Sequence, residues 1–168
     1  MEKLFSPWRS KYIESFKGAA EKSSGCIFCD AVSASADSEN LVVYRGTEAF
    51  VIMNLYPYNS GHMMIVPKRH TADFKTLTTS ELAECMKLLQ VAQQALQEMV
   101  APHGYNIGMN LGRSAGAGIE DHLHWHIVPR WNGDTNFMPA LADIKVVSED
   151  MHLQHQKLTA LFQKILTA

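Results

Sequence analysis

The central part of the chain contains short apolar runs separated by turn residues, a pattern typical of β-strands. Three such runs occupy residues 41–46, 49–56 and 62–70, with turns at residues 46–47 and 57–61 between them. Connections this short cannot contain the helical crossover that parallel neighbours require. The pattern therefore predicts three consecutive strands in an antiparallel meander.

Two other stretches show helical spacing. A capping box begins at Thr78, and the apolar residues that follow it recur near helical spacing, which predicts a helix over residues 79–101. A second amphipathic helix is predicted over residues 148–168. Between these helices, residues 106–111 and 122–128 predict two further strands joined by a glycine-rich segment.

Composition limits the classes of partner. The chain has 168 residues, of which 46% are hydrophobic, so it can form one domain with a full core, preceded by an N-terminal extension at residues 1–25. A formal net charge of -2 supplies no long-range attraction to nucleic acid or anionic membranes. No apolar run approaches the ~20 residues of a membrane span, and the N-terminus lacks the apolar core of a secretory signal. We therefore expect a cytoplasmic protein that binds neither nucleic acid nor membranes. Residues 30–40 are small and polar, and we expect them to form a surface loop.

Three histidines alternate with large apolar residues in the stretch DHLHWHIVPRW, residues 121–131. On a strand, His122, His124 and His126 would share one face and the residues between them the other. An exposed histidine-rich face and a mononuclear metal centre built on two of the histidines are the alternatives. The Cα atoms of the outer two would lie ~13 Å apart, which suits a row of phosphate oxygens better than a single ion.

This motif resembles the signature of the histidine triad (HIT) superfamily of nucleotidyl hydrolases and transferases. The resemblance covers about residues 25–137 and includes Asn54 at a strand end, the Gly61-His62 pair and the Pro67-Lys-Arg-His70 segment. It implies an α+β HIT-like fold, with an antiparallel five-stranded sheet, a long helix and a C-terminal helix. It also implies a single HIT domain over residues 1–168 and a homodimer.

The segments 110–118 and 128–137 look most like the bacterial diadenosine tetraphosphate phosphorylase branch of the family. The implied function is cleavage of diadenosine polyphosphates by nucleotidyl transfer, with orthophosphate or water as the acceptor. A HIT hydrolase of other nucleotide phosphoanhydrides or phosphoramidates is one alternative. A nucleotide-binding regulatory module with incidental cleavage is another.

Family resemblance assigns the catalytic roles to three histidines. His124 is implied to attack the α-phosphorus and to hold the nucleotide as a phosphoramidate, while a backbone carbonyl of the triad strand holds its other ring nitrogen. A neutral imidazole suits this role, because it is a good nucleophile near pH 7. His126 and His62 are expected to flank the phosphate and stabilise the charge that develops there.

The expected substrate-binding residues combine polar side chains with a glycine-rich loop. Glycines allow main-chain N–H groups to approach phosphate closely. Other HIT branches commonly carry a glutamine at the position of Gly118, so we expect backbone contacts there instead. Trp131 is either a wall against adenine or a core residue. The full expected set is Asn54, Asn110, Gly112, Ser114, Gly116, Ala117, Gly118 and Trp131.

The pair Cys26-Ile-Phe-Cys29 has the spacing of half a tetrahedral zinc site, although the spacing alone is equally compatible with redox chemistry or chance. The resemblance implies that His70 and His122 complete the ligand set. Four protein ligands would make the zinc structural, and no organic cofactor is expected. The reduced free thiols are the alternative, and Cys85 is expected in the core.

Overall fold

The computed structural model describes residues 25–134 and 150–167. The predicted N-terminal extension and the part of the phosphorylase-like segment beyond Asp134 therefore lie outside the described residues, apart from Gly25. Within the described ranges, no helix is both long enough and apolar enough to cross a membrane.

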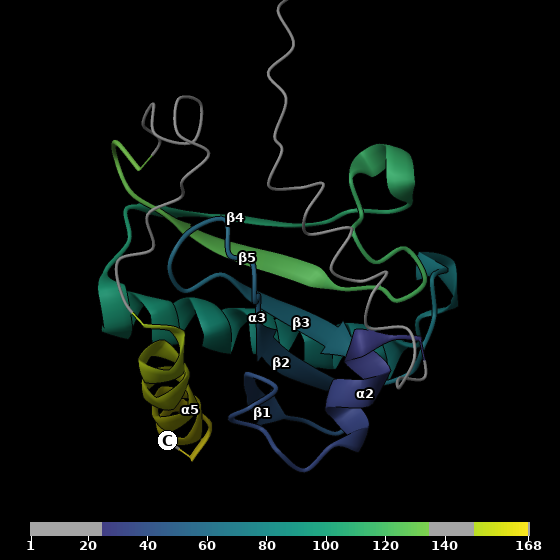
Figure 1. Ribbon diagram of the computed structural model, residues 1–168, viewed down its shortest axis with the longest axis horizontal. Coiled ribbons are helices and arrows are strands. Elements are labelled where there is room, and N and C mark those ends of the chain that lie inside the picture. The colour runs from purple at the N-terminus through teal and green to yellow at the C-terminus, as the bar shows by residue number, and fades with distance from the viewer. Residues whose placement is uncertain (1–24, 135–149, 168) are drawn as a thin grey trace, which may run out of the picture.

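A five-stranded antiparallel sheet forms the centre of the structure, as the sequence predicts (Figure 1). Its spatial order is β1-β2-β3-β5-β4, and every neighbouring pair is antiparallel. The first three strands form the predicted meander. The strands are β1 (Val42–Arg45), β2 (Ala49–Met53), β3 (Met63–Pro67), β4 (Gly104–Met109) and β5 (Trp125–Arg130).

The long helix α3 (Thr79–Val100) runs across one face of the sheet (Figure 1). Its N-terminus carries the predicted capping box, in which Thr78 and Glu81 each accept a hydrogen bond from the other's backbone N–H. Arg69 binds the same carboxylate and, as the main cause, holds the pKa of Glu81 at about 2. The segment after β3 is thereby fixed to the start of α3.

The C-terminal helix α5 (Met151–Thr167) packs against α3 and β1. Asp150 caps it by accepting hydrogen bonds from the backbone N–H groups of His152 and Leu153. The prediction started this helix at residue 148, which lies outside the described residues. Leu158 and Phe162 are fully buried, as the amphipathic pattern indicates.

The predicted loop at residues 30–40 was wrong in its first part. A short helix, α2 (Ile27–Ser33), includes Asp30 and the three residues after it. The reason is a tertiary contact, because the Arg45 guanidinium donates hydrogen bonds to the carbonyl oxygens of Ala31, Val32 and Ala34. These carbonyls lie at the C-terminus of the helix, where the last turn leaves them without helical partners. The Arg45 guanidinium, from a later part of the chain, supplies their hydrogen bonds.

The predicted start of the histidine strand was also wrong. Pairing of β5 begins at Trp125, and His122 and His124 lie in the segment before it. There the backbone N–H of Leu123 donates to the Thr71 carbonyl, beyond the end of β3. The ladder therefore stops at Trp125, and the segment before it bonds to the chain beyond β3.

Side chains alternate across the sheet as predicted. Leu123, Trp125 and Ile127 belong to the hydrophobic core that α3 and α5 cover. The intervening histidines lie on the opposite side, where Phe28 of α2 contacts the rings of His122 and His124. One face of this segment is therefore core, and the other is available for chemistry.

Candidate functional site

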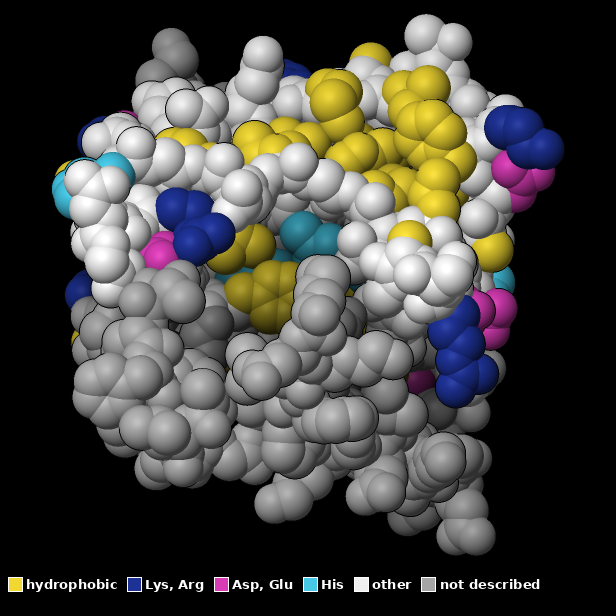
Figure 2. Space-filling view, turned by 90° about the horizontal axis from the view of Figure 1, so that it is seen from above, with side chains coloured by type: hydrophobic (Ala, Val, Ile, Leu, Met, Phe, Trp, Pro, Cys, Tyr) yellow, Lys and Arg dark blue, Asp and Glu magenta, His cyan; other side chains and the backbone are white. Residues whose placement is uncertain are grey.

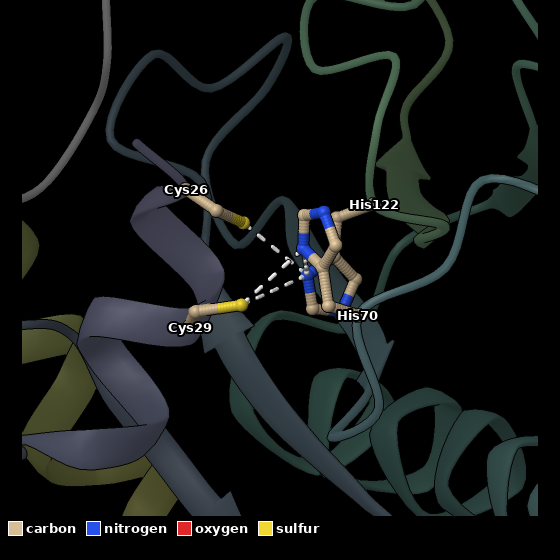
Figure 3. A group of neighbouring side chains, drawn as sticks. All are labelled: Cys26, Cys29, His70 and His122. Carbon is tan, nitrogen blue, oxygen red and sulfur yellow. Dashed lines mark hydrogen bonds between the residues drawn. The ribbon is translucent and has the colours of Figure 1, made fainter. Parts of the chain in front are cut away.

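Two cysteines and two histidines meet where α2, the end of β3 and the start of the histidine segment come together. Cys26 is the N-cap residue of α2 and Cys29 lies in its first turn. His70 follows β3, and His122 precedes β5. One ligand atom from each lies within 4.8 Å of all the others, and Figure 3 shows the thiols and rings pointing toward one another.

The spacing around the His122 Nδ1 is close to that of a tetrahedral zinc site. The Nδ1 atom of His122 lies 3.3 Å from the Cys26 Sγ, 3.7 Å from the Cys29 Sγ and 3.3 Å from the His70 Nδ1. With Zn–S bonds of about 2.3 Å and Zn–N bonds of about 2.0–2.1 Å, a tetrahedron has S···N edges of about 3.5 Å and N···N edges of about 3.3 Å. The observed separations lie close to both values.

Protonation of the ligands also fits a metal. The Nε2 atom of His122 lies 2.8 Å from the Pro67 carbonyl oxygen, which can only accept, so the neutral ring leaves an Nδ1 lone pair facing the thiols. Burial lowers the pKa of His122 and keeps it neutral. Burial, followed by the neighbouring Cys26, raises the pKa of Cys29 to about 11. Without a cation the Cys29 thiol remains protonated at neutral pH, whereas a bound divalent ion would favour the thiolate.

His124 is buried, with 4% of its surface exposed, and its ring has a defined tautomer. Its Nδ1–H donates to the His122 carbonyl oxygen at 2.8 Å, the kind of bond expected from the resemblance. The second nitrogen, Nε2, therefore carries the lone pair in the neutral ring. Burial lowers the pKa of His124, which favours this neutral form. A neutral imidazole with a free Nε2 lone pair can attack an electrophile.

A chain of hydrogen bonds determines which ring nitrogen carries the proton in His62 and in His126. The Nδ1 atom of the fully buried His62 faces two donors, the backbone N–H of Tyr58 at 3.1 Å and the Asn54 amide at 3.3 Å. It must therefore be an acceptor, which places the His62 proton on Nε2. That proton points to the His126 Nδ1 at 3.0 Å. His126 consequently carries its own proton on Nε2.

The rings form one continuous row. The centroids of His124 and His126 lie 4.8 Å apart, and those of His126 and His62 lie 5.1 Å apart. Figure 2 shows histidine at the floor of a hollow bordered by hydrophobic side chains. A nucleophilic nitrogen thus lies beside an N–H donor, an arrangement suited to group transfer at a phosphate.

The glycine-rich loop leads from β4 to the histidine segment. Gly112 and Gly116 have φ angles of 74° and 89°, in the range that favours glycine, and flank a single 3-10 turn over Arg113–Ala115. Within the loop, the Ala117 N–H donates to the Gly112 carbonyl at 3.3 Å.

The other predicted loop contacts differ in exposure. Ser114 and Gly118 are exposed, and Asn110 is partly exposed. The role of these residues in binding phosphate stays a prediction.

Asn54 and Trp131 are the remaining predicted substrate contacts, and their contact with a nucleotide stays a prediction. Asn54 is buried, and its Oδ1 accepts from the Tyr56 backbone while its amide contacts His62, so in this structure it supports the histidine row. Trp131 follows the last residue of β5 and lies five residues past His126, about 16 Å along an extended chain. Among the described residues, no ring contact joins Trp131 to the histidines.

Sequence reasoning missed two residues that contact the turn before β3. The ring of Tyr58 lies over His62, and the buried Gln154 of α5 accepts a hydrogen bond from the Gly61 N–H at 2.8 Å. Tyr58 could have been noticed from its place in the turn just before His62. Gln154 gives no local signal, because 93 residues separate it from Gly61.

Comparison with known proteins shows the family to which the sequence belongs. The HIT domain family model matches residues 35–133. An AP-4-A phosphorylase of Mycobacterium tuberculosis (strain CDC 1551 / Oshkosh) is 38% identical over 152 residues, which cover 89% of this chain and 78% of that protein.

Solved structures are similar as well. A Zn-bound histidine triad family protein from Mycobacterium smegmatis superposes with a TM-score of 0.67 at 26% identity, covering 84% of this chain and 96% of that one. A hypothetical histidine triad nucleotide-binding protein from Sulfolobus tokodaii strain 7 gives a TM-score of 0.66 at 26% identity, covering 83% and 93%.

Proposed function

Because the chain belongs to the HIT domain family, we propose that it is a nucleotidyltransferase that cleaves diadenosine tetraphosphate with orthophosphate as the acceptor. The observation that carries the proposal is the pairing of a tautomer-fixed His124 with the N–H of the adjacent His126. Likeness to an AP-4-A phosphorylase over most of both chains supports the choice of substrate.

The reaction takes place in two displacements at the same phosphorus. In the first, the His124 Nε2 lone pair attacks the α-phosphorus, an N–P bond forms, and the P–O bond to the departing ATP breaks. The positive charge on the ring is stabilised because Nδ1–H donates to the His122 carbonyl. In the second, an orthophosphate oxygen attacks the same phosphorus, the N–P bond breaks, and ADP is released.

His126 and His62 stabilise negative charge on the phosphate and do not act as nucleophiles. The His126 Nε2–H is a donor for the phosphate oxygens, and its proton position depends on the donation from His62 to Nδ1. Such a donor is most valuable where negative charge develops in a buried site. The glycine loop and its polar side chains would contact the remaining phosphates.

Zinc is proposed to be held by Cys26, Cys29, His70 and His122, the four residues whose spacing fits it. Its chemistry there is structural, since four protein ligands leave no open coordination position for water. His122 gives this site a link to the reaction, because its ring faces the thiols while its carbonyl orients His124.

We further propose that two copies pair through β4. This strand forms one edge of the sheet, and its sequence GYNIGM contains neither a charged residue nor a proline, the usual means of blocking edge pairing. Ile107 in its centre is 52% exposed. Antiparallel pairing of two such edges would bury it in a symmetric homodimer.

Sedimentation analysis of wild-type protein and of Ile107→Lys tests this pairing. We expect the variant to dimerise more weakly, and equal dimer affinity of the two proteins would contradict the pairing.

Product analysis tests the proposed reaction. Purified protein is incubated with diadenosine tetraphosphate, with and without orthophosphate, and the nucleotides are separated. We expect orthophosphate to accelerate consumption and ATP and ADP to appear in equal amounts. Release of ATP and AMP at a rate indifferent to phosphate would identify a hydrolase. Tight binding without turnover would favour a nucleotide-binding module.

A further inference from the structure

Tyr58 lies directly on two of the histidines. Its ring centroid is 4.7 Å from that of His62 and 6.1 Å from that of His126, with the second pair of rings nearly parallel at 27°. Its backbone N–H also donates to the His62 Nδ1. One residue therefore contacts both partners of the His62–His126 hydrogen bond.

Core packing does not account for this ring. Tyr58 is 47% exposed and belongs to neither of the two hydrophobic clusters among the described residues. The ring contacts that it makes in that part of the chain are both with imidazoles. The ring leaves apolar surface in contact with water and gains no core packing in return. Its position over two polar rings therefore points to a role at those rings.

We propose that Tyr58 is a positioning residue, whose ring shields the His62–His126 hydrogen bond from water and holds His126 in the tautomer that presents Nε2–H to the substrate. This inference rests on the proposed function of the histidine row. Water that reached the pair would compete for the His126 Nδ1 and allow the ring to rotate or to exchange its proton between nitrogens. The π face of Tyr58 excludes water without offering a competing donor.

The electrostatic setting of His126 agrees with such shielding. Burial is the main cause that lowers the pKa of His126 to about 4, and the neighbouring His124 lowers it further. The rings that face His126 are those of His62, His124 and Tyr58. Met64 of β3 and Gly108 of β4 lie opposite it in the sheet and carry no charge.

The test compares Tyr58→Ala with Tyr58→Phe, which keeps the ring and loses only the hydroxyl. Nitrogen-15 NMR of the histidine side chains reports tautomers without any substrate. We expect wild type and Tyr58→Phe to show His62 and His126 each protonated at Nε2 alone. In Tyr58→Ala, the His126 signals should show a mixture of tautomers and a higher pKa. Tyr56→Ala removes another exposed tyrosine from the same loop and should leave the His126 signals unchanged.

Steady-state kinetics provides the second readout. We expect Tyr58→Ala to lower kcat for diadenosine tetraphosphate about ten- to a hundredfold with little change in KM, and Tyr58→Phe to retain the wild-type kcat. Wild-type histidine signals in Tyr58→Ala, or equal losses in the two variants, would overturn the role of the ring. If the signals change as expected but even wild type cleaves no dinucleotide, the proposed function fails and the positioning role of Tyr58 is retained.

Discussion

Burial of His126 makes a specific prediction about stability at low pH. The pKa of this histidine falls from 6.5 in an unfolded chain to about 4 in the fold, chiefly because the ring is desolvated. Between these two values, the unfolded state binds a proton that the folded state does not. The free energy of unfolding therefore decreases as the pH falls through this window. Above 6.5 the His126 ring is neutral in both states, and its burial takes nothing from the free energy of unfolding.

The structure sets the size of the effect. A pKa difference of one unit corresponds to about 1.4 kcal/mol, so the interval between 6.5 and about 4 corresponds to about 3 kcal/mol. His126→Asn removes the titrating group and keeps a polar side chain. The variant should therefore lose about 3 kcal/mol less than wild type when the pH is lowered from 7 to 4.

Urea unfolding at a series of pH values measures this difference. Other titrating groups are shared by the two proteins, and both are measured with the same added zinc, so the groups that do not contact His126 cancel in the comparison. His152→Asn, on the exposed side of α5, controls for the loss of one imidazole. Stability curves of wild type and His126→Asn that run parallel from pH 7 to 4 would refute the argument that burial keeps this histidine neutral.

Three further predictions concern the supports of the site. Purified protein should contain about one zinc per chain and Cys29→Ala none, and metal analysis that finds no zinc in stable wild-type protein would contradict the tetrahedral site. Gln154→Leu leaves the buried Gly61 N–H without its acceptor and should cost about 1–3 kcal/mol in urea unfolding, so an unchanged midpoint would count against that hydrogen bond. Glu84 accepts from the backbone N–H groups of three consecutive residues, two in the β1–β2 turn and the first of β2, and Glu84→Gln should also cost about 1–3 kcal/mol by the same assay. Equal stability of this variant and wild type would show that the carboxylate does not hold the turn.

Local patterns predicted the elements whose stability is local. The helix from Thr79 was placed within a residue or two because its capping box and its apolar spacing lie in the same stretch of sequence. The alternation around His124 likewise identified a core face and a chemical face. Features that depend on contacts distant in sequence were missed or misplaced. The short helix at Ile27–Ser33 depends on Arg45, and the start of β5 depends on Leu123, whose N–H bonds to the Thr71 carbonyl beyond the end of β3.

The same distinction applies to the site. Motif spacing selected the four residues that converge as a metal cluster and the histidines that form the row. It could not predict their tautomers, which follow from hydrogen bonds to Asn54, Tyr58 and the His122 carbonyl. Nor could it show that α5 supports the turn before His62 through Gln154. Those contacts exist only once the chain has folded.

Covalent capture of the nucleotide tests the central claim most directly. Enzyme mixed with diadenosine tetraphosphate in the absence of orthophosphate is quenched within milliseconds into alkaline denaturant, because phosphoramidates are labile to acid, and its peptides are mapped by mass spectrometry. The account predicts an adenylyl group on His124. It also predicts that His124→Asn gives no adduct and loses at least ~10³-fold in rate, which is on the order of 4 kcal/mol of barrier. An adduct on another residue, or near-normal turnover by His124→Asn, would contradict the account.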